Sequence, residues 1–215
     1  MEPVRITTED DVSLEGEIRM PEGRAVGSAV ICHPHPRHGG SKDHPILWAV
    51  RGELAHRGFA VLGFNFRGVM GSGGTYGGGR AELHDVRAAI GSARDRAGGP
   101  TLVVGWSFGA GVALREALDD ERVAALALVG IPLTPGDIDL PALPGSPELR
   151  ALARRPVLLV AGENDAFCPS DRLRTFGAGF PAAEVKILAG TDHYFWHREK
   201  ELAELVGEFA ESLSP

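Results

Sequence analysis

The sequence predicts a single α/β domain over residues 1–215, with a mostly parallel central sheet and helices on both of its faces. Short apolar runs, which are typical of strands buried on both faces, alternate with segments whose apolar residues recur at helical spacing. This alternation favours parallel strands that are joined by helices. A chain of 215 residues that is 43% hydrophobic is long and apolar enough for one domain with a substantial core.

The first part of the chain alternates strands with helices. Residues 12–20 carry apolar side chains at every second position, which predicts a half-exposed strand, and we expect it to be an antiparallel edge. The apolar runs 28–32 and 60–64 predict buried strands. Helical spacing predicts one helix that ends at Gly58 and a second helix, from these residues: Ile46, Leu47, Val50 and Leu54, then Leu83, Val86 and Ile90.

The second part continues the same alternation. The apolar run 101–104 predicts a strand, and residues 107–118 predict a helix rich in small side chains. Further apolar runs predict strands at 123–129, 156–161 and 184–188. The last helix is predicted by an apolar stripe made of Leu202, Leu205, Val206, Phe209 and Leu213.

One segment interrupts the alternation. Residues 131–155 contain five prolines, too many for a long helix, although 147–154 has room for a short one. We therefore expect a short excursion here and no second domain.

Charge and composition exclude several classes of protein. The net charge of −7, a pI near 5.6 and the lack of any Lys/Arg run argue against a protein that binds nucleic acid. Residues 1–5 lack the pattern of a secretory signal, and no apolar run is long enough to span a membrane. Two cysteines, Cys32 and Cys168, make no disulfide framework. We expect a cytoplasmic enzyme that acts on a small molecule.

The pentapeptide Gly105-Trp106-Ser107-Phe108-Gly109 joins a predicted strand to a predicted helix. A serine between two glycines at such a junction has the pattern of a nucleophile elbow, in which a tight turn holds the hydroxyl above a helix N-terminus. In a chain with 29 glycines this pattern also arises by chance, with a purely structural serine. The interpretation therefore depends on finding partners for Ser107.

A serine hydroxyl needs a base to take its proton, and the base needs an acid that orients it. Asp165 follows the predicted strand 156–161 by a short loop, and His193 follows the strand 184–188 in the same way. Because the carboxyl ends of parallel strands meet at one edge of a sheet, we expect Asp165 and His193 to lie near Ser107. The chain order Ser, Asp, His is that of the α/β-hydrolases.

Other roles for these residues stay open. Asp165 is also suited to cap a helix that begins near Ser170, and Glu163 and Asp192 compete for the role of the acid. Asp192 is adjacent to His193, so its carboxylate is poorly situated to reach the imidazole nitrogen that faces away from Ser107. The alternative interpretation of His193 is a surface histidine with ordinary hydrogen-bond partners.

An oxyanion hole needs two backbone N–H groups, and the first is expected from Phe108, the residue after the nucleophile. The second is expected from the loop after strand 28–32. Pro34 and Pro36 have no N–H, whereas His35 between them does, so we favour His35. The alternative donor segment is His38-Gly39-Gly40, which lies further from the strand.

Several neighbouring residues allow two interpretations each. His33, His35 and His38 suggest a metal site, but no carboxylate joins them at ligand spacing, so we predict no metal. Arg67 either contacts substrate or braces loops, and bracing is the favoured interpretation. Phe167, Tyr194 and Trp196 either line a pocket or belong to the core. Cys168 is either a regulatory thiol or, as we favour, a buried bystander.

These motifs together resemble those of the compact α/β-hydrolases related to dienelactone hydrolases and acyl-peptidase-like esterases, and of a small bacterial subgroup in particular. The matching segments are Cys32-His33-Pro34-His35-Pro36 with Gly39-Gly40-Ser41, Phe64-Asn65-Phe66-Arg67-Gly68, the elbow, Gly162-Glu163-Asn164-Asp165 with Pro169, and Gly190-Thr191-Asp192-His193-Tyr194-Phe195. The resemblance implies an α/β-hydrolase fold with a minimal cap at 131–155. It also implies Ser107 as nucleophile, Asp165 as acid and His193 as base. Dienelactone hydrolases have a cysteine nucleophile, so Ser107 argues against dienelactone as the substrate.

The expected activity is hydrolysis of a carboxylic ester through an acyl-enzyme, with no cofactor, at a shallow and open site. A peptidase or a thioesterase would have the same three side chains. If the protein is not an enzyme, the alternative is a non-catalytic binding module of the same fold.

Overall fold

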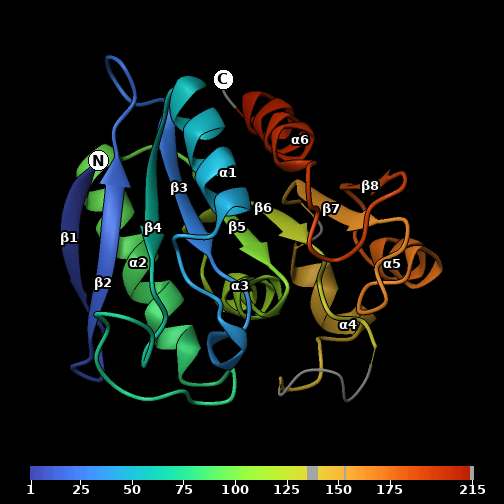
Figure 1. The fold of residues 1–215 in the computed structure, drawn as a ribbon, viewed down its shortest axis with the longest axis horizontal. Coiled ribbons are helices and arrows are strands. Elements are labelled where there is room, and N and C mark those ends of the chain that lie inside the picture. Colours follow the sequence, from blue (N-terminus) through green and yellow to red (C-terminus); the bar gives the residue numbers. More distant parts are fainter. Residues whose placement is uncertain (135–139, 153, 214–215) are drawn as a thin grey trace.

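The computed structural model describes residues 1–134, 140–152 and 154–213, and its centre is one eight-stranded sheet with helices on both faces (Figure 1). The strands run in the order β1-β2-β4-β3-β5-β6-β7-β8. They are β1 Glu2–Thr7, β2 Ser13–Arg19, β3 Gly27–Cys32, β4 Phe59–Phe64, β5 Thr101–Trp106, β6 Val123–Val129, β7 Val157–Gly162 and β8 Ala183–Leu188. The neighbours from β4 to β8 pair in parallel. The predicted α/β class is confirmed.

The helices connect these strands in the way that the alternation predicts. They are α1 Pro45–His56, α2 Glu82–Ala97, α3 Phe108–Asp119, α4 Ser146–Leu149, α5 Ser170–Gly177 and α6 Glu199–Glu211, with short 3₁₀ turns at Pro36–His38 and Arg150–Leu152. Gly58 follows α1 with φ +91, a left-handed conformation that suits glycine after a helix.

One expectation about the sheet was wrong. Strand β2 is antiparallel, as predicted, but it is not the edge, because β1 pairs along its outer side. Only Val4 and Ile6 of β1 are buried, while its other side chains are exposed. So few buried apolar positions do not stand out as a strand pattern in the sequence.

The two faces of the sheet carry separate cores. On one face, α1 and α6 pack side by side and bury residues such as Leu47, Leu54 and Val206. The other face is covered by α2, α3 and α5, with Val86, Val112 and Leu173 in the core. Covering both faces explains why the strands β3 to β7 are apolar along nearly their whole length.

The proline-rich segment 131–155 falls partly outside the described residues, since 135–139 and 153 are not described. Its described part contains the short helix α4, in the region where a short helix is predicted. Leu149 and Leu152 from this part pack into the core on the α3 face. Across the described ranges, no helix is both long and apolar enough to cross a membrane.

Candidate active site

The turn between β5 and α3 holds Ser107 in a strained conformation, with φ +55 and ψ −118. A Cβ on Gly109 would lie 2.3 Å from the carbonyl oxygen of Cys32, and a Cβ on Gly105 would lie 2.5 Å from backbone atoms of the turn. Both positions therefore require glycine. The N–H of Ser107 donates to the carbonyl oxygen of Val129 at 2.8 Å, which ties the turn to β6.

The structure brings the three predicted side chains into one hydrogen-bonded chain. His193 Nε2 lies 3.0 Å from Ser107 Oγ, and His193 Nδ1 lies 2.8 Å from Asp165 Oδ2. The side chains come from the carboxyl ends of β5, β7 and β8, and all three residues are buried. Both nitrogens of the imidazole thus have the neighbours that a base between a hydroxyl and a carboxylate requires.

Backbone groups fix the second oxygen of Asp165. The N–H groups of Phe167 and Cys168 both donate to Asp165 Oδ1, each at 2.9 Å, which leaves Oδ2 for His193. The competing acids make other contacts: Asp192 accepts from the N–H of Tyr194, and Glu163 accepts from the N–H of Gly190. Asp165 is therefore the carboxylate that contacts the imidazole.

A pocket of about 170 Å³ opens in front of Ser107. Its lining residues mostly have aromatic side chains or are glycine and proline: Pro34, His35, His38, Gly39, Gly40, His44, Trp106, Ser107, Phe167, His193 and Tyr194. None of the described residues of segment 131–155 belongs to this lining. Phe167 and Tyr194, two of the aromatic residues with open interpretations, thus line the pocket.

The two residues predicted to supply oxyanion donors are neighbours. Phe108 is the first residue of α3, so its N–H has no partner within the helix, and the positive end of the helix dipole lies at this point. His35 lies at the pocket, and its ring centroid is 5.0 Å from that of Phe108. Their roles as backbone donors to an oxyanion stay a prediction.

Comparison with known proteins decides the family. The sequence profile of the alpha/beta hydrolase domain matches residues 29–213. The chain belongs to this alpha/beta hydrolase family. The hydrolase is also similar to solved structures: an α/β serine hydrolase homologue from Coxiella burnetii has a TM-score of 0.82 and 28% identity, with 96% of each chain covered.

Two further solved structures have the same fold at lower identity. A serine hydrolase from Xanthomonas campestris, described as having no lid, has a TM-score of 0.82 and 22% identity, covering 99% of this chain and 94% of that one. An esterase from Pyrococcus furiosus has a TM-score of 0.83 and 21% identity, covering 100% of this chain and 91% of that one. These two likenesses show the shared fold, while the family and the Coxiella homologue support a hydrolase.

Three residues at the site of this hydrolase were missed in the sequence. Trp106 donates from Nε1 to the carbonyl oxygen of His193 at 3.2 Å, which attaches the end of β5 to the loop after β8. Gly130 has φ +53, and a Cβ there would lie 3.1 Å from the ring of His193. His44, at the N-terminus of α1, packs edge-on against Trp106. The position of Gly130 directly after a predicted strand was a signal available for it, since the other site residues share that position.

The loop that carries His35 is held at both ends by the turn after β4. His33 is fully buried, accepts the N–H of Phe66 at its Nε2, and hence carries its proton on Nδ1, 2.6 Å from the carbonyl oxygen of Pro34. Asn65 Oδ1 accepts the N–H of Lys42 at 2.8 Å. This clamp makes His33 a structural residue in its neutral form.

The folding stability of the hydrolase is expected to depend on pH through His33. Burial lowers the pKa of His33 from 6.5 to about 4. Between these two values the unfolded chain binds a proton that the folded chain excludes, so folding stability falls as pH falls. This group alone is expected to remove on the order of 3 kcal/mol of unfolding free energy between about pH 7 and pH 4.

Urea unfolding at a series of pH values measures this effect. The variant His33→Gln is expected to be less stable at neutral pH and to show a shallower loss on acidification than the wild type. His56→Gln, at an exposed histidine of α1, is the control and should follow the wild-type profile. Parallel pH profiles for wild type and His33→Gln would contradict the assignment.

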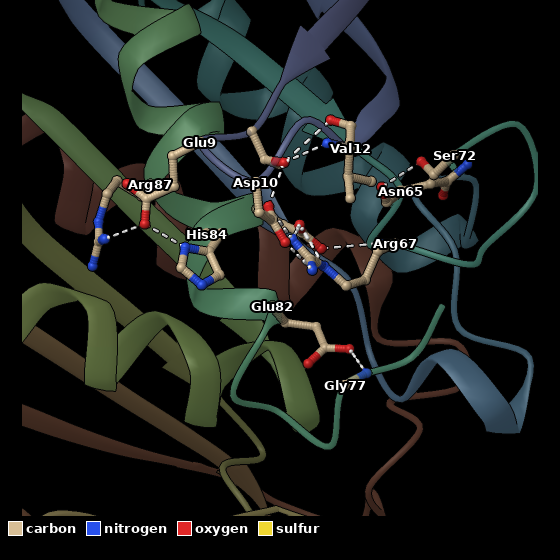
Figure 2. A network of polar contacts seen from close by, with 12 residues as sticks. Glu9, Asp10, Val12, Asn65, Arg67, Ser72, Gly77, Glu82, His84 and Arg87 are labelled. Atoms are coloured by element: carbon tan, nitrogen blue, oxygen red, sulfur yellow. Dashed lines mark hydrogen bonds and ion pairs between the residues drawn. The ribbon is translucent and has the colours of Figure 1, made fainter. Parts of the chain in front are cut away.

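Arg67 is not part of the pocket lining, and it braces loops through a network of polar contacts (Figure 2). Its guanidinium contacts Asp10 through Nη1 at 2.7 Å and the fully buried Asp85 through Nε at 2.9 Å and Nη2 at 2.7 Å. Its own backbone N–H also donates to Asp85. These contacts tie the turn after β4 to α2 and to the β1–β2 hairpin, in agreement with the interpretation as a brace.

Cys168 is structural as well. Cys168 is fully buried, and burial raises the pKa of its thiol, which disfavours the reactive thiolate. Of the three loop histidines, His33 has both nitrogens engaged by backbone groups, and His35 Nδ1 accepts the N–H of Arg37. Within the part of the chain that the structure describes, no three His, Cys, Asp or Glu residues gather as a potential metal site.

Proposed function

We propose that this hydrolase cleaves carboxylic esters through an acyl-enzyme formed on Ser107. The observation that carries the proposal is the hydrogen-bonded chain from Ser107 Oγ through His193 to Asp165, with distances of 3.0 and 2.8 Å. The elbow and the N-terminus of α3 support it, because the elbow presents the hydroxyl of Ser107 to the pocket and the helix N-terminus stabilises the negative charge that develops beside it.

The proposed reaction has two halves. In the first, Ser107 Oγ attacks the carbonyl carbon while His193 Nε2 takes its proton, and the tetrahedral oxyanion accepts from the N–H groups of Phe108 and His35. His193 then gives the proton to the leaving alcohol. In the second half, His193 takes a proton from water as the water oxygen attacks the acyl carbon, and His193 then returns the proton to Ser107 Oγ as the acid leaves. Asp165 keeps Nδ1 protonated and stabilises the imidazolium throughout.

The size of the pocket supports a small acyl group. A volume of about 170 Å³ is below the range of roughly 300–1,000 Å³ that is usual for ligand pockets. No described residue from 131–155 covers the pocket, which is consistent with an open site without a lid, like that described for the Xanthomonas relative.

A substrate panel combined with covalent labelling tests the proposal. We expect acetate and butyrate esters to be hydrolysed faster than matched thioesters and dipeptides, and a fluorophosphonate to modify Ser107 in the folded protein. Mass spectrometry of the digested protein locates the modification. Failure to label Ser107 would favour the non-catalytic binding module, while a preference for thioesters or dipeptides would replace the ester by that substrate.

A further inference from the structure

The loop between β8 and α6 exposes two large aromatic side chains beside the active site. Tyr194 and Trp196 are 47% and 53% exposed, whereas Phe195 between them is fully buried in the core under α1 and α6. Phe195 and His197 have φ values of +51 and +64, a range that residues other than glycine rarely adopt. The anchored Phe195 and this strained backbone direct its two neighbours outward.

These aromatic rings are continuous with the pocket. The ring of Tyr194 lies 5.6 Å from that of His193, and the rings of Tyr194 and Trp196 are 6.5 Å apart at an interplanar angle of 24°. His44, which lines the pocket, lies 6.0 Å from the ring of Trp196. An aromatic surface thus extends from His193 to the outside of the molecule.

The position of this surface indicates which part of a substrate it contacts. The leaving alcohol must lie next to His193, because His193 gives it a proton. Tyr194 is adjacent to His193 in the chain and contacts its ring. The alcohol portion therefore extends along the side of the pocket that Tyr194 and His44 line, toward Trp196, and the rest of the pocket receives the acyl group.

We propose that Tyr194 and Trp196, with His44, form a subsite for an uncharged, planar aromatic group on the alcohol side of the ester. Tyr194 and His44 belong to a pocket lining that contains no Asp, Glu, Lys or Arg among the described residues, which favours an uncharged ring against them. An aromatic ring gains from stacking against exposed aromatic faces in addition to the area that it buries. The inference rests on the proposed ester hydrolysis and specifies its substrate class.

Two esters that differ only in aromaticity test the subsite. Benzyl acetate and cyclohexylmethyl acetate share the acyl group and have primary alcohols as leaving groups. We expect the ratio of their kcat/KM values to favour benzyl acetate in the wild type and to fall about threefold to tenfold in Tyr194→Leu and in Trp196→Leu. Trp196→Phe, which keeps an aromatic face, should retain most of the ratio.

Matched controls separate a subsite from a general loss of activity. Trp48→Leu removes another exposed tryptophan, 39% exposed and outside the pocket lining, and should leave the ratio unchanged. Competitive inhibition measures binding without turnover. The preference for benzyl alcohol over cyclohexylmethanol as an inhibitor should fall in Trp196→Leu by the same factor as the ratio of kcat/KM values. Thermal melting checks that each variant is folded.

Three outcomes would overturn the inference. An unchanged ratio in Trp196→Leu, whether or not both esters lose activity equally, would remove the aromatic subsite while ester hydrolysis that depends on Ser107 would still stand. An unchanged ratio with an altered oligomeric state would assign the aromatic surface to contact between copies of the chain. Absence of turnover for every ester would remove the proposed function itself, and the subsite with it.

Discussion

Replacing Ser107 by alanine is expected to lower kcat/KM for p-nitrophenyl acetate by a factor on the order of 10⁴ to 10⁶. The substitution removes Oγ, which is 3.0 Å from His193 Nε2, and leaves the acyl group nothing to bond to. It does not change the backbone conformation that the elbow requires, so the thermal melting temperature should stay close to that of the wild type.

The exposed Ser212, at the end of α6, provides the matched control. Ser212→Ala is expected to hydrolyse p-nitrophenyl acetate at the wild-type rate. The fluorophosphonate should label Ser212→Ala but not Ser107→Ala. Equal turnover by wild type and Ser107→Ala would mean that the hydrolysis comes from another group.

Replacing Asp165 by asparagine is expected to lower kcat by about 10³- to 10⁴-fold while the fold is retained, as for the corresponding substitution in other enzymes with this arrangement. Two backbone N–H groups donate to Asp165 Oδ1, so the asparagine must turn its carbonyl oxygen toward them. Its NH₂ group then faces His193 Nδ1, which must become an acceptor. The proton moves to Nε2, where it faces Ser107, and His193 can no longer act as the base.

Asp192→Asn is the control for this prediction, because Asp192 is the neighbouring acid that competes for the role in the sequence. Its carboxylate accepts the N–H of Tyr194, which an asparagine oxygen can also do. We expect kcat within about threefold of the wild type, in the range of substitutions away from the reacting atoms. A larger loss in Asp192→Asn than in Asp165→Asn would reverse the assignment of the two acids. Steady-state kinetics on p-nitrophenyl acetate measures both variants.

Most of the fold could be predicted because its pattern is local. Each buried parallel strand is a short apolar run, and α1, α2 and α6 each have an apolar stripe, so the alternation is visible without knowledge of the neighbours. Strand β1 was missed because only Val4 and Ile6 face the core, and two positions make no distinguishable period. The edge of the sheet was therefore predicted at β2, whereas the true edge is β1.

The meeting of Ser107, Asp165 and His193 was predictable for a geometric reason. Parallel strands end at the same edge of the sheet, so residues that directly follow them converge whatever their separation in the chain. The contacts that support them were not predictable in this way. Gly130 against the imidazole and His44 against Trp106 depend on how loops from different strands pack over the edge.

The sequence by itself determined the α/β class, the strand–turn–helix context of Ser107 and the identity of its two partners. Those follow from local patterns and from the common direction of parallel strands. Only the tertiary structure decided that Arg67 is a brace, that His33 clamps the loop of His35, and that Tyr194 and Trp196 stay exposed beside His193. Burial and hydrogen-bond partners are set by segments far away in the chain, and no local pattern encodes which of those segments will cover a side chain.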